Sequence, residues 1–413
     1  MENINLISDN KFKTNFLKLR YMIKSNELNY NKAILLKDYL SYANNKTKTN
    51  KKTIEVLDAL YDTSFNISVY LKGDQICFDF NIMFISSLFI KEEQYLNKVL
   101  RLFITFIKDP LLKDGTISND IIKKNKFDII NDIKAVYDDK NQYAYQEFSQ
   151  LFGQDTSMAI NENGNEIIIK QLSNEDLYDF YQIILNNHPY IYGYVNKDDQ
   201  EVIETFLNNN FTANNLYPII NNIALKVHEY QEFQVIDKIK QAKLFIGLTF
   251  SKPYHNQDFF KYQLLNILLG QSSNSYLFKI VREQENLCYS IRSHYDHYYN
   301  TIIINAGIDS DNYQKSMHLI NEIIDKLKKG TIDNEDFLIA KKVMIDITKK
   351  INDQQSSIIN YLINRKSMGL NNDLVKEIAL INELSLNDLK EVAMNIKVSM
   401  SYLLKEEPSK GVV

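Results

Sequence analysis

The stretch that decides the fold is residues 268–309, LLGQSSNSYLFKIVREQENLCYSIRSHYDHYYNTIIINAGID. The helical spacing of its apolar residues ends at Gly270, and a turn of small residues leads into a second short helix, 275–283. Two strands that pair with each other are predicted next, at 289–299 and 301–308. The first strand has polar and aromatic side chains on both faces. That pattern is atypical of a core strand and suits one that lines a cavity for a polar polymer such as a peptide.

The strand 289–299 also contains the closest approach to a metal motif, His294-Tyr-Asp-His297. Residues three apart in a strand point to opposite faces, so these two rings are not expected to converge on a metal ion. None of the six histidines belongs to an H-E-x-x-H or H-x-x-E-H pattern. We therefore expect no metal site in this chain. Alternation places on one face Tyr289, Ile291, Ser293, Tyr295 and His297, and on the other Ser290, Arg292, His294, Asp296 and Tyr298.

The same order of elements is predicted twice along the chain. Each half begins with a strand and a helical region, continues through a pair of strands and a long helical region, and closes with a strand. In the first half the predicted strands are 16–23, 64–71, 75–85 and 190–195, with helices at 30–42, 52–61, 91–112, 118–151 and 174–185. In the second half the strands are 244–250, 289–299, 301–308 and 399–404, with helices at 258–269, 275–283 and 313–329 and then through 393.

One local match connects the halves. Ser173 and Ser385 each stand three residues before an aspartate, Asp176 and Asp388, at the start of the last helix of their half. A serine followed in this way by an acidic residue is an N-terminal cap. The repeated cap supports an internal duplication. We expect an α+β fold with two homologous halves, each a mainly antiparallel sheet with helices on one face.

The domain boundaries that we expect are an N-terminal half over 1–210, a linker over 211–234 and a C-terminal half over 235–413. The linker region is rich in asparagine and less periodic than its flanks.

Composition excludes several classes of protein. The chain has 413 residues and a formal charge of -4, and no basic patch interleaved with aromatics suggests a nucleic-acid partner. Its apolar runs are too short to span a bilayer, and its N-terminus lacks the apolar core of a secretory signal. Only two cysteines occur, Cys77 and Cys288, which fits a reducing compartment. We expect a cytoplasmic protein without a membrane partner.

The segment 268–309 resembles the C-terminal-half signature of the M16 peptidases, the insulinase, pitrilysin and mitochondrial-processing-peptidase family, and other stretches resemble its Bacillus-type branch. The resemblance covers nearly the whole chain. The departures are Gln271, Gln284 and Cys288, where a Gly, a Lys and a small residue are common. The signature residues are Gly270, Ser272, Ser273, Leu277, Phe278, Arg282, Glu283, Leu287, Tyr289 and Ser290.

The resemblance implies a division of labour between two chains. In this family zinc binds on a first-half helix as H-x-x-E-H, but the matching helix here, 34–43, reads ILLKDYLSYA and has no histidine or glutamate. The resemblance implies that Arg282 holds a substrate carbonyl and that Tyr289 stabilises the tetrahedral intermediate, both in trans. Substrate contacts are expected from Gly270, Ser272, Ser273 and Ser290. Zinc is expected in a heterodimeric partner, an H-x-x-E-H-bearing paralogue, for the processing of peptides or leader peptides.

Other interpretations stay open at the level of sequence. The chain could be a non-proteolytic peptide-binding or assembly protein of the same fold, or a homo-oligomeric enzyme of unrelated chemistry. Arg282 could pair with Glu283 or Glu285 on a helix surface, and Tyr289 could be a core aromatic.

Overall fold

The computed structural model describes residues 4–212, 218, 220, 222–223, 225, 229–252, 255–371 and 373–406. The expected linker, 211–234, therefore lies in part outside the described residues. The chain forms two compact units. Unit 1 comprises residues 1–135, 160–219 and 354–367, and unit 2 comprises 136–159, 220–353 and 368–413.

Each unit is built on a five-stranded sheet, and the two sheets have the same order. The order in unit 1 is β1-β7-β2-β4-β3, and in unit 2, from the matching edge, β8-β12-β9-β11-β10. The first pair in each order, β1 with β7 and β8 with β12, is parallel, and the other three pairs of each sheet are antiparallel. The expected α+β duplication is confirmed. The strands are β1 Ile4–Ser8, β2 Thr14–Lys24, β3 Ser64–Lys72, β4 Gln75–Ile85, β7 Tyr190–Val195, β8 Gln231–Asp237, β9 Ala242–Phe250, β10 Cys288–Asp296, β11 Thr301–Ile308 and β12 Ile396–Glu406, with a small hairpin of β5 Leu112–Lys113 and β6 Thr116–Ile117.

Most of the predicted helices are present. In unit 1 the helices are α1 Glu27–Tyr42, α2 Asn50–Ala59, α3 Tyr95–Lys108, α4 Asn119–Ala135, α6 Glu166–Gln171, α7 Asn174–Asn186, α8 Gln200–Asn210 and α12 Gln355–Ser367. In unit 2 they are α5 Lys140–Phe152, α9 Phe259–Asn266, α10 Tyr313–Lys329, α11 Asn334–Lys350, α13 Leu374–Glu383 and α14 Leu386–Ala393. Helices α6 and α8 were not predicted from the sequence. Both predicted caps are complete capping boxes: Ser173 with Asp176, and Ser385 with Asp388.

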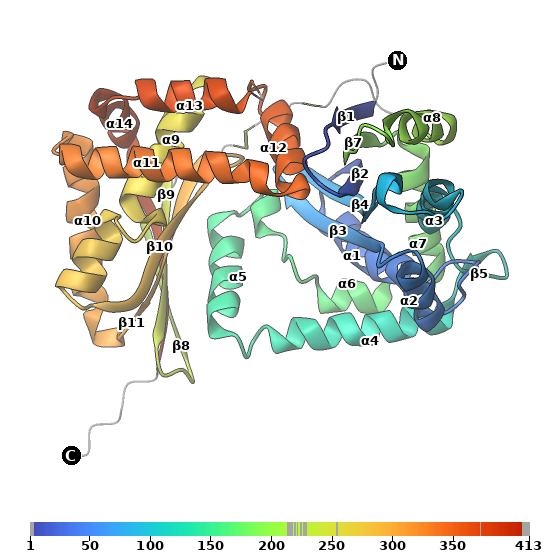
Figure 1. Ribbon diagram of the computed structural model, residues 1–413. Helices are drawn as coiled ribbons and strands as arrows, with labels where there is room; N and C mark the ends of the chain where they lie inside the picture. Colours follow the sequence, from blue (N-terminus) through green and yellow to red (C-terminus); the bar gives the residue numbers. More distant parts are fainter. Residues whose placement is uncertain are drawn as a thin grey trace. The chain divides into compact units, whose positions relative to one another are not determined.

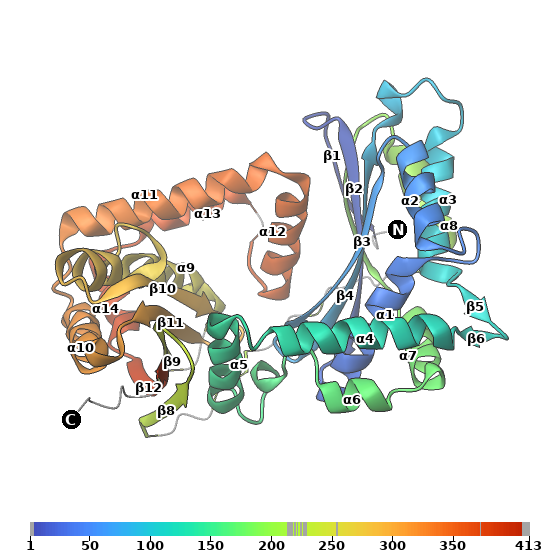
Figure 2. The same ribbon diagram turned by 90° about the horizontal axis from the view of Figure 1, so that it is seen from below.

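Two helices belong to the unit opposite to the one that their place in the sequence suggests. Helix α5 lies in the first half of the chain but packs in unit 2, and α12 lies in the second half but packs in unit 1. In each unit the exchanged helix covers the sheet face that the other helices leave open (Figures 1 and 2). The expectation that helices cover only one face is therefore wrong for both sheets. The helical region predicted over 118–151 divides into two helices, because the first helix ends at Ala135 and Asp139 caps a new one.

Strands β1 and β8 were not predicted from the sequence. β1 is only five residues long, and β8 is exposed over most of its length, so neither shows the alternation of a half-buried strand. β8 also begins inside the expected linker. Both strands form the parallel edge of their sheets.

Aromatic stacking holds α5 on the sheet of unit 2. The rings of Phe148 and Tyr145 lie 5.6 and 5.7 Å from the ring of Phe245 on β9. The Phe152 ring lies directly over Gly247, where a Cβ atom would overlap it. Glycine at 247 is thus required by close packing.

Gly247→Ala is expected to lower the free energy of unfolding by roughly 1–3 kcal/mol, because the added methyl group forces Phe152 away from the strand. Urea denaturation measures this loss. In a Phe152→Ala background the same glycine substitution should cost distinctly less, since the ring that it meets is gone. Equal costs in the two backgrounds would mean that Phe152 does not set the requirement.

Charged residues are buried on the face of the unit 1 sheet that carries α12. Arg20 and Asp79 form a two-point ion pair with N–O distances of 2.7 and 2.6 Å, and both side chains are 0% exposed. Lys18 donates to Asp79 at 2.9 Å and to Asn360 of α12 at 2.9 Å. The hydroxyl of Tyr70 also donates to Asp79, at 2.9 Å. Helix α12 is therefore held by polar contacts to a buried ionic cluster.

Candidate functional site

The segment that carries the sequence signature begins with two π-helical turns. Helix α9 continues as a π-helical turn over Ile267–Gln271, and a second one covers Leu277–Gln284. Such turns are rare and recur at functional sites. Gly270 lies at the end of the first, where a Cβ atom would come within 2.7 Å of both Leu277 and the Ser293 hydroxyl. Gly270 therefore lets the turn pack closely against β10.

The small residues after Gly270 form the connection between the two turns. The Ser272 hydroxyl accepts a hydrogen bond from the Asn274 amide, and its carbonyl accepts from the Ser275 amide. Ser272 is half-buried and Ser273 is exposed. Gly270 is buried. Substrate contact by Gly270, Ser272, Ser273 and Ser290 stays a prediction.

Tyr289 lies on a β-bulge in the edge strand β10. Cys288 pairs with Ile308 and Ser290 with Gly307, so one extra residue stands between consecutive pairs of the ladder. The bulge changes the alternation that the sequence predicts, because Cys288 is buried with Ile291 while Tyr289 is 65% exposed. The expectation that Tyr289 shares a face with Ile291 is therefore wrong, and so is the interpretation of Tyr289 as a core aromatic.

Arg282 is near the end of the second π-helical turn, with its side chain 40% exposed. Its Nε lies 3.6 Å from a Glu283 carboxylate oxygen, and its guanidinium lies 4.5 Å from the centre of the Phe278 ring. The expected pair with Glu283 is thus present, whereas Glu285 binds Lys315 at 2.8 Å. An exposed ion pair of this length adds little stability and does not hold the guanidinium firmly. Arg282 and Tyr289 are both accessible to a ligand.

A polar groove lies beside this segment, within unit 2. It has a volume of about 720 Å³ and lies between the N-terminal part of α5 and the sheet. Asn305 of β11 spans part of it by donating to Asn141 of α5 at 3.0 Å. The sequence placed Arg292 and His294 on a strand that suits the lining of a cavity. It did not predict the lining residues from α5, because the packing of α5 in unit 2 depends on contacts between distant segments of the chain. The lining residues are Asp139, Asn141, Gln142, Tyr145, Phe245, Gln271, Arg292, Ser293, His294, Ile303 and Asn305.

The first-half helix expected to match the zinc helix of the resembled family does not fit a metal. On α1, Ile34 is buried in the core, and Lys37 pairs with Asp38 at 3.0 Å. Burial raises the pKa of the Asp38 carboxyl, which disfavours its charged form. Among the residues that the structure describes, no group of three or more His, Cys, Asp or Glu side chains could hold a metal ion. These residues cannot supply the imidazoles that zinc needs.

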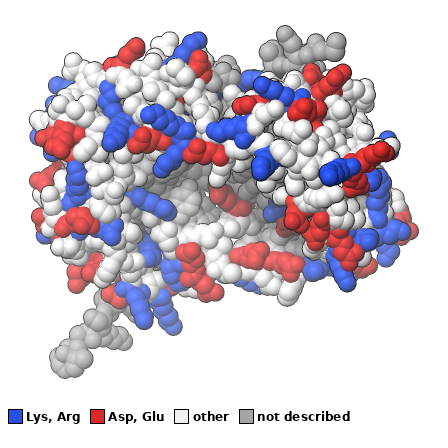
Figure 3. Space-filling model, viewed as in Figure 1, with Lys and Arg blue, Asp and Glu red and all other residues white. Residues whose placement is uncertain are grey.

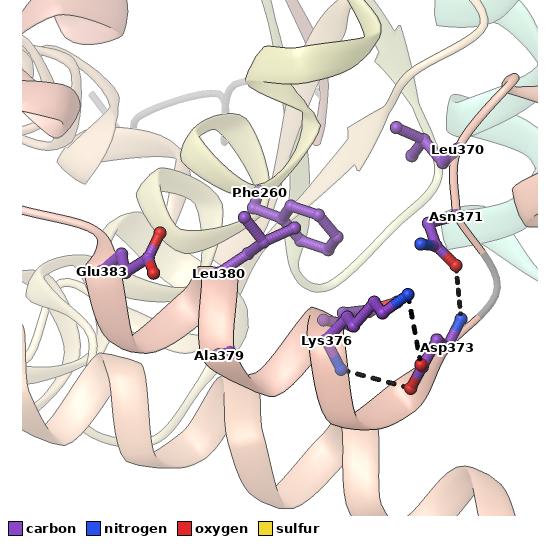
Figure 4. A pocket seen from close by; sticks show the side chains of 9 residues that line it. Phe260, Leu370, Asn371, Asp373, Lys376, Ala379, Leu380 and Glu383 are labelled. Carbon is purple, nitrogen blue, oxygen red and sulfur yellow. Dashed lines mark hydrogen bonds and ion pairs between the residues drawn. The ribbon is translucent and has the colours of Figure 1, made fainter.

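A second, smaller pocket lies on the helical side of unit 2, between α13 and α9. It has a volume of about 320 Å³, and Phe260, Leu370 and Leu380 form its apolar part. Asp373 at its rim caps α13 and lies 3.9 Å from Lys376 (Figure 4). Asp373 and Lys376 at this rim therefore contribute to the N-terminal end of α13.

Charged side chains of both signs are interspersed over the visible surface, with no large patch of one sign (Figure 3). In the described part of the chain, no helix is long and apolar enough to cross a membrane.

Comparisons of the sequence with known proteins find relatives that are described as inactive peptidases or metalloproteases. The family described as "Peptidase M16 inactive domain" matches residues 171–344. The chain is 25% identical over 408 residues to the "Probable inactive metalloprotease YmfF" of Bacillus subtilis, covering 97% of this chain and 95% of that protein.

Solved structures share the fold over the whole chain. A conserved protein from Enterococcus faecalis is 20% identical, with a TM-score of 0.87 and coverage of 99% of both chains. A structure described as a peptidase M16 inactive domain from Pseudomonas fluorescens is 13% identical, with a TM-score of 0.77 and coverage of 98% of this chain and 96% of that one. At these identities the likeness is one of fold.

Proposed function

We propose that this chain, which is similar to inactive members of the M16 peptidase family, is the zinc-less subunit of a heterodimeric metalloendopeptidase. In this proposal it binds the peptide substrate and supplies Arg282 and Tyr289 to the active site of a catalytic partner. The partner is an M16 paralogue with an H-x-x-E-H motif, which holds the zinc. The complex would process peptides or leader peptides in the cytoplasm.

The observation that carries the proposal is the exposure of Tyr289. A large aromatic side chain that is 65% exposed contributes little to the core, and the bulge that turns it outward adds a residue to an otherwise regular ladder. Bulges recur beside active sites, where they redirect a side chain. This arrangement favours a role for Tyr289 toward another molecule.

The chemistry assigned to the two residues follows from their hydrogen-bonding groups. The guanidinium of Arg282 has donors only, and it can hold the backbone carbonyl of a bound peptide. The hydroxyl of Tyr289 can donate to the oxygen on which negative charge develops during cleavage of the peptide bond. Donors aimed at such an oxygen lower the barrier most when they are held in place beforehand.

Reconstitution tests the proposed function. The chain and the H-x-x-E-H-bearing paralogue of the same organism are purified separately and assayed on a quenched fluorescent peptide library. We expect cleavage by the mixture only, and zinc in the paralogue only. A mixture with a paralogue whose motif glutamate is replaced by glutamine is the inactive control. Cleavage by this chain alone, or by the paralogue alone at the rate of the mixture, would contradict the proposal.

A second candidate function is a peptide-binding or assembly protein without proteolysis. The groove between α5 and the sheet favours it, because a groove of this size in a single unit can bind a ligand without any catalytic partner. A stable complex with the paralogue that never cleaves peptide would support this candidate over the first.

A further inference from the structure

The groove of unit 2 contains the side chain of an arginine, Arg292, which lies on the exposed face of β10. Among the residues that the structure describes, none forms a hydrogen bond or ion pair with its guanidinium. His294 lies two residues further along the same face and lines the groove as well. An arginine in a concave polar site is well placed to hold a carboxylate through two parallel hydrogen bonds.

The acidic groups near the groove leave this cation available. The Asp139 carboxylate caps α5 by accepting from the amides of Asn141 and Gln142, at 3.0 and 3.1 Å. Asp296 interacts electrostatically with His294, but burial raises the pKa of Asp296 and so disfavours its charge. Neither acid is paired with Arg292.

The rest of the lining suits a peptide main chain. Side-chain amides from three elements face the groove, and amides both donate and accept hydrogen bonds, as a peptide backbone does. Some of these amide groups already form hydrogen bonds within the protein, since Asn305 donates to Asn141 and Gln271 accepts from Asn266. Apolar surface comes from Tyr145, Phe245 and Ile303. The volume lies in the usual range of about 300–1,000 Å³ for ligand sites.

We propose that this groove binds a peptide segment through its carboxylate, which Arg292 holds. The choice of a peptide as the ligand rests on the proposed function, whereas the choice of a carboxylate rests on Arg292 and its surroundings. The carboxylate has two possible sources, the C-terminus of a peptide or an acidic side chain within it. The site is separate from Arg282 and Tyr289 in its residues and needs no catalytic partner.

Binding to the full chain, without a partner, tests the proposal. Three fluorescein-labelled polyalanine peptides are titrated by anisotropy: one with a free C-terminus, one with a C-terminal amide, and one with the amide and an internal glutamate. We expect at least one peptide with a carboxylate to bind about tenfold or more tightly than the plain amide. A free C-terminus that binds alone identifies the terminal carboxylate, and binding by the glutamate peptide identifies the side chain.

Substitutions locate the binding. Arg292→Gln is expected to reduce the affinity for the carboxylate peptide to that for the plain amide, and Arg292→Lys to restore part of it, because lysine keeps the charge but not the fork of donors. Arg101→Gln, at an exposed arginine of α3, is the matched control and should change nothing. Thermal melts confirm that each variant is folded.

Three results would overturn the proposal: equal affinity for all three peptides, unchanged binding by Arg292→Gln, or no binding at peptide concentrations up to about 1 mM, the Kd of a very weak complex. Because no partner is present, these results do not depend on whether the reconstituted mixture cleaves peptide. An inactive mixture would likewise leave this proposal intact.

Discussion

Tyr289→Phe is expected to lower the turnover number of the reconstituted complex by roughly 10²–10³-fold, the usual effect of removing one donor to a developing oxyanion. The substitution deletes one hydroxyl from a side chain that is 65% exposed, so the fold of this chain should not change. KM should change much less than kcat, because the hydrogen bond is proposed to strengthen only as charge develops. Steady-state kinetics with the zinc-bearing partner measures both constants.

Matched substitutions separate this role from a general effect on the complex. Tyr61→Phe removes the hydroxyl of another exposed tyrosine, 44% exposed in unit 1, and should leave kcat unchanged. Arg282→Ala should lower kcat/KM, because it removes a donor to the substrate backbone. If Tyr289→Phe and Arg282→Ala both turn over like the unaltered chain, the proposed role in trans is wrong.

Asp79→Ala is expected to destabilise unit 1 by about 3–5 kcal/mol, the cost of leaving a buried charge without its partner. Asp79 is the shared acceptor for Arg20, Lys18 and Tyr70, and the side chains of Arg20 and Asp79 are 0% exposed. Hydrogen exchange of peptides from β2 and β4, followed in urea, reports on this unit specifically. Asp120→Ala is the control, since its pair with Lys113 at 3.5 Å is exposed on both sides and should contribute less than about 1 kcal/mol.

The same cluster predicts a dependence of stability on pH. Burial alone would raise the pKa of Asp79, but Arg20 and Lys18 outweigh it and hold the pKa well below its usual value. A depressed folded-state pKa contributes stability above the unfolded value, about 3.9, and that stability is lost as pH falls below it. Stability of unit 1 should therefore fall more steeply between about pH 5 and pH 3 in the unaltered chain than in Asp79→Asn. Parallel slopes would contradict the pairing.

Local signals accounted for most of the elements. The capping boxes of α7 and α14 depend on a serine and an aspartate three residues apart, so they can be identified from the sequence alone. Helix α10 begins and ends at the residues that its apolar spacing predicts, 313 and 329. The β3–β4 hairpin follows from its alternation and from the turn at Gly73, which has a positive φ of 53°.

Only part of the candidate site could be predicted from local sequence signals. Gly270 and Arg282 were found through a resemblance in the segment that contains them, and the absence of histidine from the α1 segment could be read directly. The direction of Tyr289 could not be predicted, because a bulge shifts the alternation by one residue and leaves no clear trace in the residues themselves. The residues of α5 that line the groove were not predicted, because this helix was expected to pack in the N-terminal half of the molecule.

By itself, the sequence determined the duplicated α+β order, the caps and the absence of a zinc motif, because periodicity, capping and ligand chemistry act within a few residues of each other. Only the tertiary structure decided which unit α5 and α12 join, which way Tyr289 points, and that Arg20 and Asp79 are buried together. Each of these depends on contacts between segments far apart in the chain. Burial and packing set such contacts, and no spacing within one segment records them.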